Sequence, residues 1–448
     1  MAHLPPPTLE SCRALDAADP LAPLRAQFRL PPDLIYLDGN SLGAMPQAAA
    51  SQVQRALEQE WGQGLIRSWN DAGWIHRAQA VGDAIAPLVG AGAGELTVAD
   101  STSINLHKVL WAAMALGQQR APQRQVLLTE RDNFPTDRYI AQGLCDQFGW
   151  TIREVAPIPA SAERPVPQEL LDALAAPDVG LLLLTHVNYR TGAMHDMAAL
   201  NRLAHAAGVI TVWDLAHSTG AVPVNLKEPG AGADFAVGCG YKFLNGGPGA
   251  PAFVWVHPGH VNAVEQPLRG WFGHAAPFEF DAGYRPAAGI ARYTCGTPPI
   301  LSLTALQAGV QTLGAASPWG GMAALRAKSL SLTRTFIAAS AATARAHGLQ
   351  LVTPMEDSRR GSQVSWGCGP QAPDGYTVMR ALIARGVVGD FRASPRPGEP
   401  DILRFGFAPL YNTHVEAWDA AQALGEELQR ASSARAAGAA LVARSAVT

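Results

Sequence analysis

The feature that most constrains the fold is an alternation of short apolar runs with alanine- and leucine-rich stretches between residues 50 and 310. Each apolar run has the length of a strand, and each stretch between them has the length of a helix. Such alternation predicts an α/β fold in which helices cover both faces of a mostly parallel sheet. We assign residues 50–310 to this large domain. The strand candidates are Gln125 to Thr129, Val179 to Thr185, Val209 to Trp213, Phe235 to Gly238 and Ala252 to Val256.

The rest of the chain predicts a smaller α+β domain and two end segments. Residues 1–49 are expected to be an N-terminal arm that joins the small domain, because they begin proline-rich and weakly patterned. The small domain is assigned to 311–430 and a tail to 431–448. Its candidate elements are a long helical pattern from Leu303 to Ala346, strands at Gln350 to Val352, Gln363 to Trp366 and Ile402 to Phe407, and helices at Tyr376 to Arg385 and from Val415.

Composition narrows the class of protein. A chain of 448 residues that is 48% hydrophobic can bury a large core, and a net charge of -3 gives no positive field for a nucleic acid, so a small-molecule ligand is favoured. The longest apolar run is too short to cross a membrane, and no signal peptide is present. We therefore expect a cytoplasmic protein without a membrane or metal partner. Its scattered cysteines fit neither a zinc site nor a disulfide framework: Cys12, Cys145, Cys239, Cys295 and Cys368.

Two charged residues follow strand candidates at the sheet edge where open parallel sheets bind ligands. Asp214 comes directly after Val209 to Trp213, and Lys242 lies in the glycine-rich segment Cys239 to Gly249. Glycines beside a lysine indicate backbone that passes close to a bulky group. A desolvated lysine forms Schiff bases, and an aspartate facing a pyridine nitrogen keeps that nitrogen protonated. Singly, the two residues fit a helix cap and a surface lysine; together they predict pyridoxal 5′-phosphate as a Schiff base on Lys242.

A phosphate cradle is predicted at Ser101 and Thr102. They follow the apolar stretch Leu96 to Ala99 and open the helical run Ile104 to Leu116. Helix N-termini offer free N–H groups to phosphate. Plain N-capping by Asp100 or Ser101 explains the same residues equally well when the lysine site is left aside.

Phe134 and Arg404 are candidates whose roles the residues alone leave open. Phe134 lies within Asn133 to Asp137, where an aromatic ring either stacks on a pyridine ring or packs in the core. Arg404 lies within the strand-like segment Asp401 to Pro409. An arginine there either binds a substrate carboxylate or forms an internal ion pair.

The chain resembles the kynureninases, and among them the bacterial type. Ordered motifs carry the resemblance over most of the sequence: Leu37 to Gly43, Asn133 to Asp137, Trp213 to Ser218, Tyr241 to Gly249, Gly270 to Gly273 and Ala408 to Asn412. The resemblance implies an aspartate-aminotransferase-type (fold type I) homodimer with shared active sites. It also implies hydrolysis of the β,γ carbon–carbon bond of L-kynurenine to anthranilate and L-alanine. That reaction belongs to tryptophan degradation by the kynurenine pathway, which also serves NAD biosynthesis.

The resemblance further implies roles for individual residues. Lys242, Tyr241 and Asp214 are the implied catalytic residues, with Asp214 on the pyridinium nitrogen and Tyr241 in acid–base support. Trp271 and Thr297 are expected to reach the phosphate of the neighbouring subunit. The full set of implied cofactor-binding residues is Ser101, Thr102, Phe134, Pro135, Thr136, Asp137, Thr185, Asp214, His217, Tyr241, Lys242, Trp271 and Thr297. The implied substrate-binding residues are Arg404, which would bind the carboxylate, and Trp69, Asn40 and Ser41.

Trp69 and Thr297 also predict a substrate preference. At the corresponding positions, kynureninases that prefer 3-hydroxykynurenine carry a histidine and an asparagine. An indole at Trp69 adds bulk and lacks the hydrogen bond that a histidine gives the 3-hydroxyl group. We therefore expect this chain to prefer L-kynurenine and to accept 3-hydroxykynurenine less well.

Three other classes of protein compete with this interpretation. Gly39 to Gly43 matches the nucleophile-elbow pattern of serine α/β-hydrolases, although Ser41 lies near the N-terminus and is not followed by a helical pattern. A cysteine desulfurase or selenocysteine-lyase-like enzyme shares the Asp and Lys arrangement and needs a mobile cysteine, for which Cys368 is the candidate. A binding scaffold with an inactive lysine site is disfavoured because Lys242 and Asp214 are both present.

Overall fold

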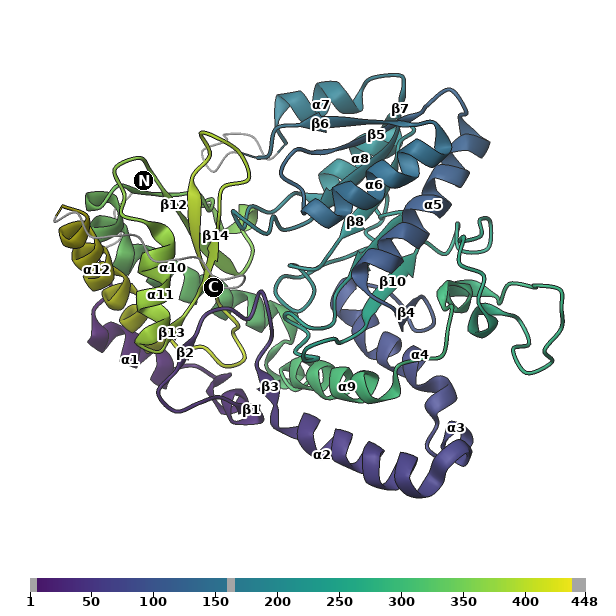
Figure 1. Ribbon diagram of the computed structural model, residues 1–448, viewed down its shortest axis with the longest axis horizontal. Helices are drawn as coiled ribbons and strands as arrows, with labels where there is room; N and C mark the ends of the chain where they lie inside the picture. The colour runs from purple at the N-terminus through teal and green to yellow at the C-terminus, as the bar shows by residue number, and fades with distance from the viewer. Residues whose placement is uncertain (1–5, 159–165, 437–448) are drawn as a thin grey trace.

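A seven-stranded sheet forms the centre of the larger lobe in the computed structural model, which describes residues 6–158 and 166–436 (Figure 1). The strand order is β4-β10-β9-β8-β7-β5-β6. Strand β10 runs antiparallel to both of its neighbours, and the remaining ladders are parallel. The predicted mostly parallel α/β sheet is therefore confirmed. Its strands are β4 (Leu96–Ala99), β5 (Val126–Glu130), β6 (Thr151–Val155), β7 (Val179–Thr185), β8 (Ile210–Asp214), β9 (Phe235–Gly238) and β10 (Ala252–Val256).

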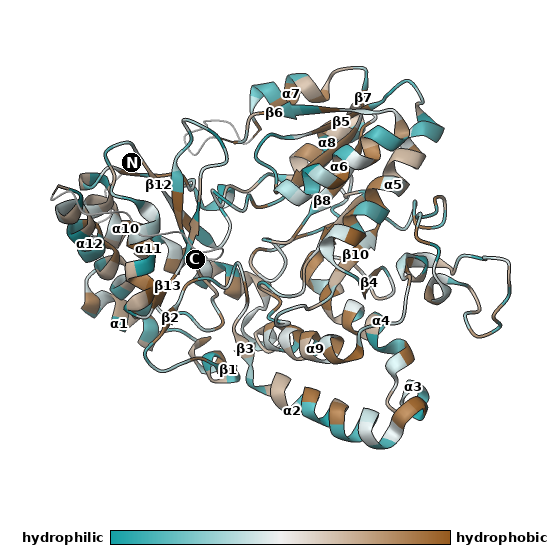
Figure 2. Cartoon of the chain, viewed as in Figure 1, coloured by the Kyte–Doolittle hydropathy of each residue, from teal (hydrophilic) through white to brown (hydrophobic). Residues whose placement is uncertain are grey.

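Helices cover both faces of this sheet, which explains why its strands are continuous apolar runs rather than alternating ones. All seven residues of β7 are buried. One face packs against α5 (Thr102–Arg120) and α6 (Pro135–Phe148). The other packs against α4 (Trp74–Ile85), α7 (Gln168–Leu174), α8 (Met197–Ala206) and α9 (Ile300–Gly314). Figure 2 shows apolar (brown) and hydrophilic (teal) residues following one another along the helices around this sheet.

A second, four-stranded antiparallel sheet lies in the smaller lobe. Its order is β11-β12-β15-β14, formed by β11 (Leu349–Leu351), β12 (Gln363–Cys368), β14 (Asp390–Arg392) and β15 (Asp401–Gly406). The helices α10 (Met322–Ala346), α11 (Gly375–Ala384) and α12 (His414–Ala436) share its hydrophobic core. Helix α12 continues past residue 431, where we placed the start of a tail, and residues 437–448 lie outside the described part of the chain.

The long helical pattern predicted over Leu303 to Ala346 is not one continuous helix. The chain instead forms α9 and α10, which are separated by a 3-10 turn at Ser317–Trp319. Gly320 and Gly321 follow that turn with φ values of 101° and 58°, a left-handed conformation that stops a helix. Pro318 and the two glycines were a local signal for this break.

The N-terminal segment packs on the small lobe before the chain enters the large one. It contains α1 (Leu9–Ala17), β1 (Phe28–Arg29), β2 (Ile35–Tyr36) and β3 (Met45–Pro46). Strand β2 pairs in parallel with β13 (Val387–Val388), and β1 pairs with β3. Helix α2 (Gln47–Arg55) then extends outward along the lower edge of Figure 1, followed by a π-helical stretch at Ala56–Gly64, a 3-10 turn at Leu65–Arg67 and α3 (Ser68–Asp71).

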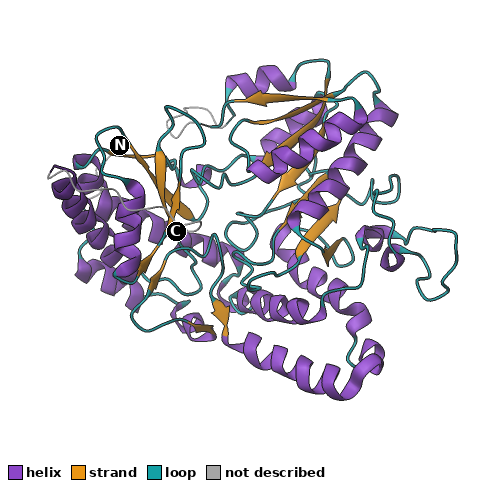
Figure 3. Cartoon of the chain, in the orientation of Figure 1, coloured by secondary structure: helices purple, strands orange, loops and turns teal. Residues whose placement is uncertain are grey.

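The long connection between β10 and α9 is mostly loop, as Figure 3 shows. It contains two short 3-10 turns, Trp271–Gly273 and Gly289–Tyr293. Further 3-10 turns lie at Ala22–Gln27, Ala86–Val89 and Asp357–Arg359. Across the described ranges, no helix is both long and apolar enough to cross a membrane.

Candidate active site

Lys242 and His217 meet at the carboxyl edge of the large sheet. His217 follows β8, Lys242 follows β9, and Lys242 Nζ lies 3.0 Å from His217 Nε2. Burial, reinforced by the nearby Lys242 charge, holds the pKa of His217 well below its usual range. The imidazole is therefore neutral, and its Nε2 accepts a hydrogen bond from the lysine.

Lys242 differs from every other lysine of the chain. The sequence has four: Lys108, Lys227, Lys242 and Lys328. The other three form ion pairs, with Asp100, Glu95 and Asp19 respectively. Within the described residues, Lys242 forms no ion pair, and its partner is an uncharged ring.

Glycine is required where the Lys242 loop meets the N-terminal segment. Gly43 N donates to Tyr241 O at 2.8 Å, and a Cβ at Gly43 would lie only 2.3 Å from Lys242 O. Gly247, in the turn after the lysine, has a φ of 83°. The two motifs of the sequence that contain these glycines thus pack directly against each other.

Two buried carboxylates lie at the same edge. Asp214 ends β8, and its Oδ1 accepts from Ala216 N at 2.8 Å; Asp137 lies in the first turn of α6. Burial raises the pKa of both groups, the neighbouring Asp214 raises that of Asp137 further, and Lys242 opposes the rise in each. Among the described residues, Asp137 Oδ2 has no hydrogen-bond partner. Two adjacent buried carboxylates favour a cation between them.

The segment Asn133 to Asp137 joins these groups to β7. The Thr185 hydroxyl donates to Asn133 Oδ1, and the Asn133 amide donates to Thr129 Oγ1 at 3.2 Å. The Phe134 ring contacts Tyr189 edge-on at 5.2 Å and is 39% exposed, so it is not part of the buried core. Pro135 and Thr136 begin α6 beside it, with the proline at the first helical position.

Arg404 is fully buried and held from several sides. Its Nη1 donates to Tyr189 O at 2.7 Å, and its Nη2 donates to Ser41 Oγ at 2.6 Å and to Asp390. Asp38 lies 3.9 Å from the same nitrogen. Burial and the Asp390 charge raise the pKa of Asp38 to about 7, against the effect of Arg404. Arg404 Nε is buried and has no hydrogen-bond partner among the described residues. The internal ion pair therefore exists, and one N–H of the guanidinium is left without a partner in the described structure.

Asn40 and Gln363 form hydrogen bonds that connect the surroundings of Arg404 with His217. Asn40 Nδ2 donates to Gln363 Oε1 at 3.4 Å, and Gln363 Nε2 donates to Tyr189 O at 3.1 Å. Gln363 also bonds to His217. Asn40 is buried, and its Oδ1 has no hydrogen-bond partner in the described ranges.

The predicted phosphate cradle begins α5. Ser101 is the N-cap residue, and its hydroxyl accepts from Ile104 N at 3.4 Å. Thr102 Oγ1 is buried and lacks a hydrogen-bond partner within the described residues. The capping role is therefore present at Ser101, whereas the Thr102 hydroxyl takes no part in it.

Three predicted site residues lie apart from this group in the single chain. The Trp69 ring lies 6.0 Å from Phe272, and the Trp271 ring lies 4.9 Å from the same Phe272. Trp271 is 38% exposed and Thr297 is exposed. In the part of the chain that the structure describes, no hydrogen bond or ring contact joins them to the Lys242 group.

Four residues of this site were missed by the sequence reasoning: Asp38, Tyr189, Gln363 and Asp390. Tyr189 follows the end of β7 by four residues, so inspecting strand ends more broadly would have found it. Asp390 lies opposite Arg404 in the β14–β15 ladder, and no local sequence pattern predicts this pairing.

The structure argues against both rival nucleophiles. Ser41 lies in a turn, with its N–H donating to Asp38 O at 2.9 Å and its hydroxyl engaged by Arg404, so the nucleophile-elbow interpretation is wrong. Cys368 ends β12 rather than lying on a mobile loop, and burial raises the pKa of its thiol to about 12. Such a thiol is not a reactive nucleophile in this conformation.

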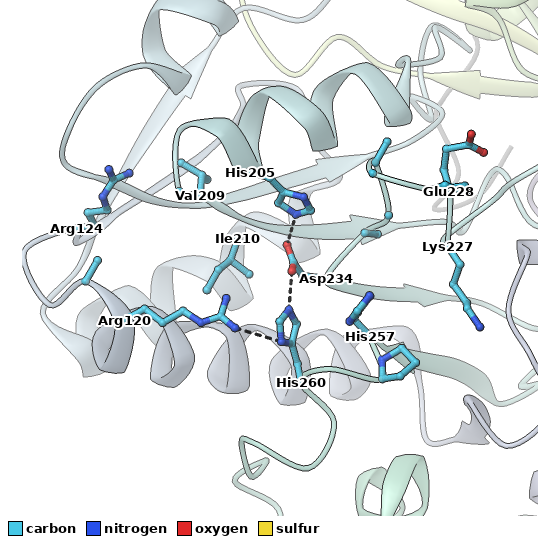
Figure 4. A pocket seen from close by; sticks show the side chains of 18 of the residues that line it. Arg120, Arg124, His205, Val209, Ile210, Lys227, Glu228, Asp234, His257 and His260 are labelled. Atoms are coloured by element: carbon cyan, nitrogen blue, oxygen red, sulfur yellow. Dashed lines mark hydrogen bonds and ion pairs between the residues drawn. The ribbon is translucent and has the colours of Figure 1, made fainter.

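A separate pocket of about 920 Å³ lies at the opposite edge of the large sheet (Figure 4). Asp234, which precedes β9, accepts from His205 Nε2 at 2.9 Å and from His260 Nε2 at 2.7 Å. Arg120 lies 3.3 Å from the other nitrogen of His260. Because this pocket is at the amino ends of β8 and β9, it is not part of the Lys242 site. Residues 6–158 and 166–436 contain no cluster of three or more side chains suited to a metal ion.

The fold and this strand-end lysine define the class of the protein: it has the fold of the fold type I pyridoxal phosphate enzymes. A cysteine desulfurase from Thermococcus onnurineus NA1 superposes with a TM-score of 0.74 at 19% identity, covering 91% of this chain and 98% of that one. The cysteine desulfurase CsdA from Escherichia coli gives 0.74 at 20% identity, covering 92% and 98%. A C-DES mutant with glycine linked to its PLP cofactor gives 0.73 at 16% identity, covering 89% and 98%.

Sequence comparison narrows the class to one family. Residues 325–424 match the model of the kynureninase C-terminal domain. A kynureninase from Pseudomonas fluorescens is 52% identical over 431 residues, which cover 96% of this chain and 97% of that protein. A kynureninase from Burkholderia pseudomallei (strain K96243) is 50% identical, covering 94% and 95%. This chain belongs to the kynureninase family.

Proposed function

We propose that this chain hydrolyses L-kynurenine to anthranilate and L-alanine, with pyridoxal phosphate held as a Schiff base on Lys242. The observation that carries the proposal is Lys242 itself. Of four lysines, it alone lies at the carboxyl edge of the sheet without an ion pair in the described structure, beside a neutral imidazole 3.0 Å away. Membership of the kynureninase family supports the reaction assigned to it.

The residues around Lys242 fit the cofactor. A protonated ring nitrogen would supply the cation that the buried Asp214 and Asp137 favour. A phosphate would give the buried Thr102 hydroxyl a partner at the start of α5. Phe134, half open to solvent, is free to lie against a ring. The two carboxylates, the Thr102 hydroxyl and the Phe134 ring thus match the ring nitrogen, the phosphate and the ring face of pyridoxal phosphate.

Arg404 is suited to orient the substrate. Ser41, Asp390 and the Tyr189 carbonyl fix its guanidinium, so little side-chain freedom remains to be lost on binding. Its unpartnered Nε–H would donate to the substrate carboxylate. With its carboxylate there, the amino acid end of the substrate would lie between the small-domain strand β15 and the Lys242 loop.

The remaining residues have proton-handling roles. When bound, the cofactor withdraws electrons from the substrate, which labilises the α proton and then the bond between the β and γ carbons. Lys242 Nζ moves the α proton, and the neutral His217 accepts a hydrogen bond from it. Burial raises the pKa of Tyr241, so its phenol stays protonated at neutral pH and is able to act as a general acid.

We further propose that the enzyme works as a homodimer with shared sites. Trp271, Phe278 and Phe280 form an exposed aromatic surface, with exposed fractions of 38%, 54% and 78%. Trp69 touches the same surface through Phe272. A patch of large exposed apolar side chains favours a protein partner, and a second copy would bring Trp69, Trp271 and Thr297 to the neighbouring Lys242 site. A cytoplasmic location remains a prediction, supported by five cysteines that are all free.

The first test is hydrolysis of the two substrates. We expect anthranilate from L-kynurenine. We also expect a preference over 3-hydroxykynurenine, in kcat/KM, that corresponds to about 1 to 3 kcal/mol, because Trp69 adds bulk and lacks the hydrogen bond that a histidine gives the 3-hydroxyl group. A Trp69→His, Thr297→Asn double variant should shift the ratio toward 3-hydroxykynurenine. Trp61→His is the control, since Trp61 is 56% exposed near the end of the π-helical stretch. Failure to form anthranilate contradicts the function; an unchanged ratio in the double variant contradicts the Trp69 and Thr297 assignment.

The second test is complementation between inactive chains. Lys242→Ala and Trp271→Ala chains, each inactive alone, should form hybrid dimers in which one of the two sites has both residues intact. Random exchange should then restore roughly a quarter of wild-type activity. Mixing Lys242→Ala with Asp214→Asn is the control, because those residues belong to one chain's site and no hybrid site is complete. Verified subunit exchange without recovery would exclude a shared site.

A further inference from the structure

Lys108 is a completely buried lysine beneath the phosphate cradle. It lies in α5, six residues after Thr102, with 0% of its surface exposed. Its Nζ donates to Asp100 Oδ2 at 2.5 Å, to Tyr293 O at 2.6 Å and to Asn105 Oδ1 at 3.2 Å. An ammonium group has three donors, and here each has a partner. A buried charge is costly unless paired in this way, so the position has a specific requirement for it.

The first partner controls the turn that leads into the cradle. Asp100 directly precedes Ser101 and Thr102, and its backbone has a φ of 48°, the left-handed region that non-glycine residues avoid. A non-glycine residue in this conformation is strained, and the strain persists only when surrounding contacts fix it. Two contacts do so: the Lys108 ion pair, and the bond from Ala252 N to Asp100 O at 2.9 Å.

The second partner belongs to the segment that carries Trp271. Tyr293 is followed by Thr294 and Cys295. The Thr294 hydroxyl lies 3.0 Å from Phe272 O and 2.6 Å from Ala291 O, and the Cys295 carbonyl accepts from Phe272 N at 3.2 Å. The backbones are so close that a Cβ at Gly270 would lie 2.1 Å from Cys295 O. Lys108 thus fixes Tyr293, and the residues after Tyr293 fix the turn of Trp271.

We propose that Lys108 is a positioning residue that fixes both phosphate-binding elements of the chain: its own cradle at Ser101 and Thr102, and the Trp271 turn offered to the partner subunit. This inference rests on the proposed function, since it assumes pyridoxal phosphate at Lys242. Lys108 has no direct role in catalysis, because its three donors are engaged within the protein. Its loss should act on the phosphate group and leave the aldehyde chemistry at Lys242 intact.

The experiment compares two probes on full-length protein freed of its cofactor. Pyridoxal phosphate and pyridoxal, which lacks the phosphate, are titrated against wild type and Lys108→Met, and binding is followed by absorbance. Methionine matches the length of the lysine stem without its charge. We expect the affinity for pyridoxal phosphate to fall at least about tenfold, while that for pyridoxal changes less than about threefold.

Lys328→Met is the matched control. Lys328 is also buried, at 8% exposure, and its Nζ pairs with Asp19 at 2.7 Å, but it joins α10 to the N-terminal segment. It should lower stability without separating the two probes. Should Lys108→Met not fold, Asp100→Asn removes the same ion pair at a side chain that is 31% exposed.

The outcomes separate this inference from the proposed function. Wild type that binds neither probe contradicts the function and the inference together. If wild type binds both probes, two results for the Lys108→Met variant contradict the inference alone. In the first, the variant binds pyridoxal phosphate as well as wild type does; in the second, it loses affinity for both probes equally. A loss confined to the phosphorylated probe supports it.

Discussion

Lys242→Ala should lower the turnover of L-kynurenine by at least about 10³-fold, even at saturating pyridoxal phosphate. The reason is that no other amine is placed to replace it. Lys108 and Lys328 are buried in ion pairs, and Lys227 pairs with Glu95 at 2.7 Å near the opposite edge of the sheet. The measurement is kcat by anthranilate formation, with the visible spectrum of the purified protein recorded alongside.

Borohydride reduction sharpens this prediction, because the chain offers only four lysines. Reduction of the yellow wild-type protein followed by peptide mapping should place the cofactor on Lys242. Lys227→Ala is the control, since its side chain is 41% exposed and its loss should alter neither colour nor turnover. Cofactor fixed to another lysine, or a colourless protein that cannot be reconstituted, would overturn the central assignment.

The position of Lys242 and Asp214 could be predicted because it depends on local pattern. Both residues follow short apolar runs, and parallel strands place their carboxyl ends at one edge. The runs at Val179 to Thr185 and Phe235 to Gly238 coincide with β7 and β9. For these two residues, the apolar pattern of the sequence was enough to predict their place at the edge of the sheet.

Arg404 shows where that reasoning stops. Its partner Ser41 is 363 residues away, and its partner Asp390 faces it only through the register of β14 on β15. Deciding between substrate binding and an ion pair required every contact of the guanidinium. Three acceptors bind its Nη1 and Nη2 groups, and Nε has no partner among the described residues. Tyr189 and Gln363 were missed for the same reason.

Trp69 and Trp271 mark a second limit. No hydrogen bond or ring contact joins them to the Lys242 group within the described residues, and local sequence pattern does not indicate which residues a second chain would contribute. Phe272 joins the two residues to one surface, a contact that only the tertiary structure reveals. The helix break after Gly314 is different, since Pro318 and the glycines after it were visible in the sequence.

Asp214→Asn should retain the cofactor and lose about 10² to 10⁴-fold in kcat. Asparagine keeps the shape and can still accept from Ala216 N, a bond of 2.8 Å in the structure, so the end of β8 should be preserved. What is lost is the buried negative charge, and an amide cannot hold a proton on the ring nitrogen. The cofactor affinity should therefore change little compared with turnover.

Asp137→Asn provides the comparison that decides between the two carboxylates. Both are buried at the same edge, and the charge of Asp214 raises the pKa of Asp137, so removing either charge relieves the same repulsion. Asp214 lies at the end of a sheet strand with one oxygen already engaged, whereas Asp137 is in the first turn of α6. If Asp214 pairs with the ring nitrogen, its variant loses far more kcat than Asp137→Asn. The reverse order would transfer that role to Asp137, and near-normal turnover in both variants would mean that neither carboxylate keeps the cofactor protonated.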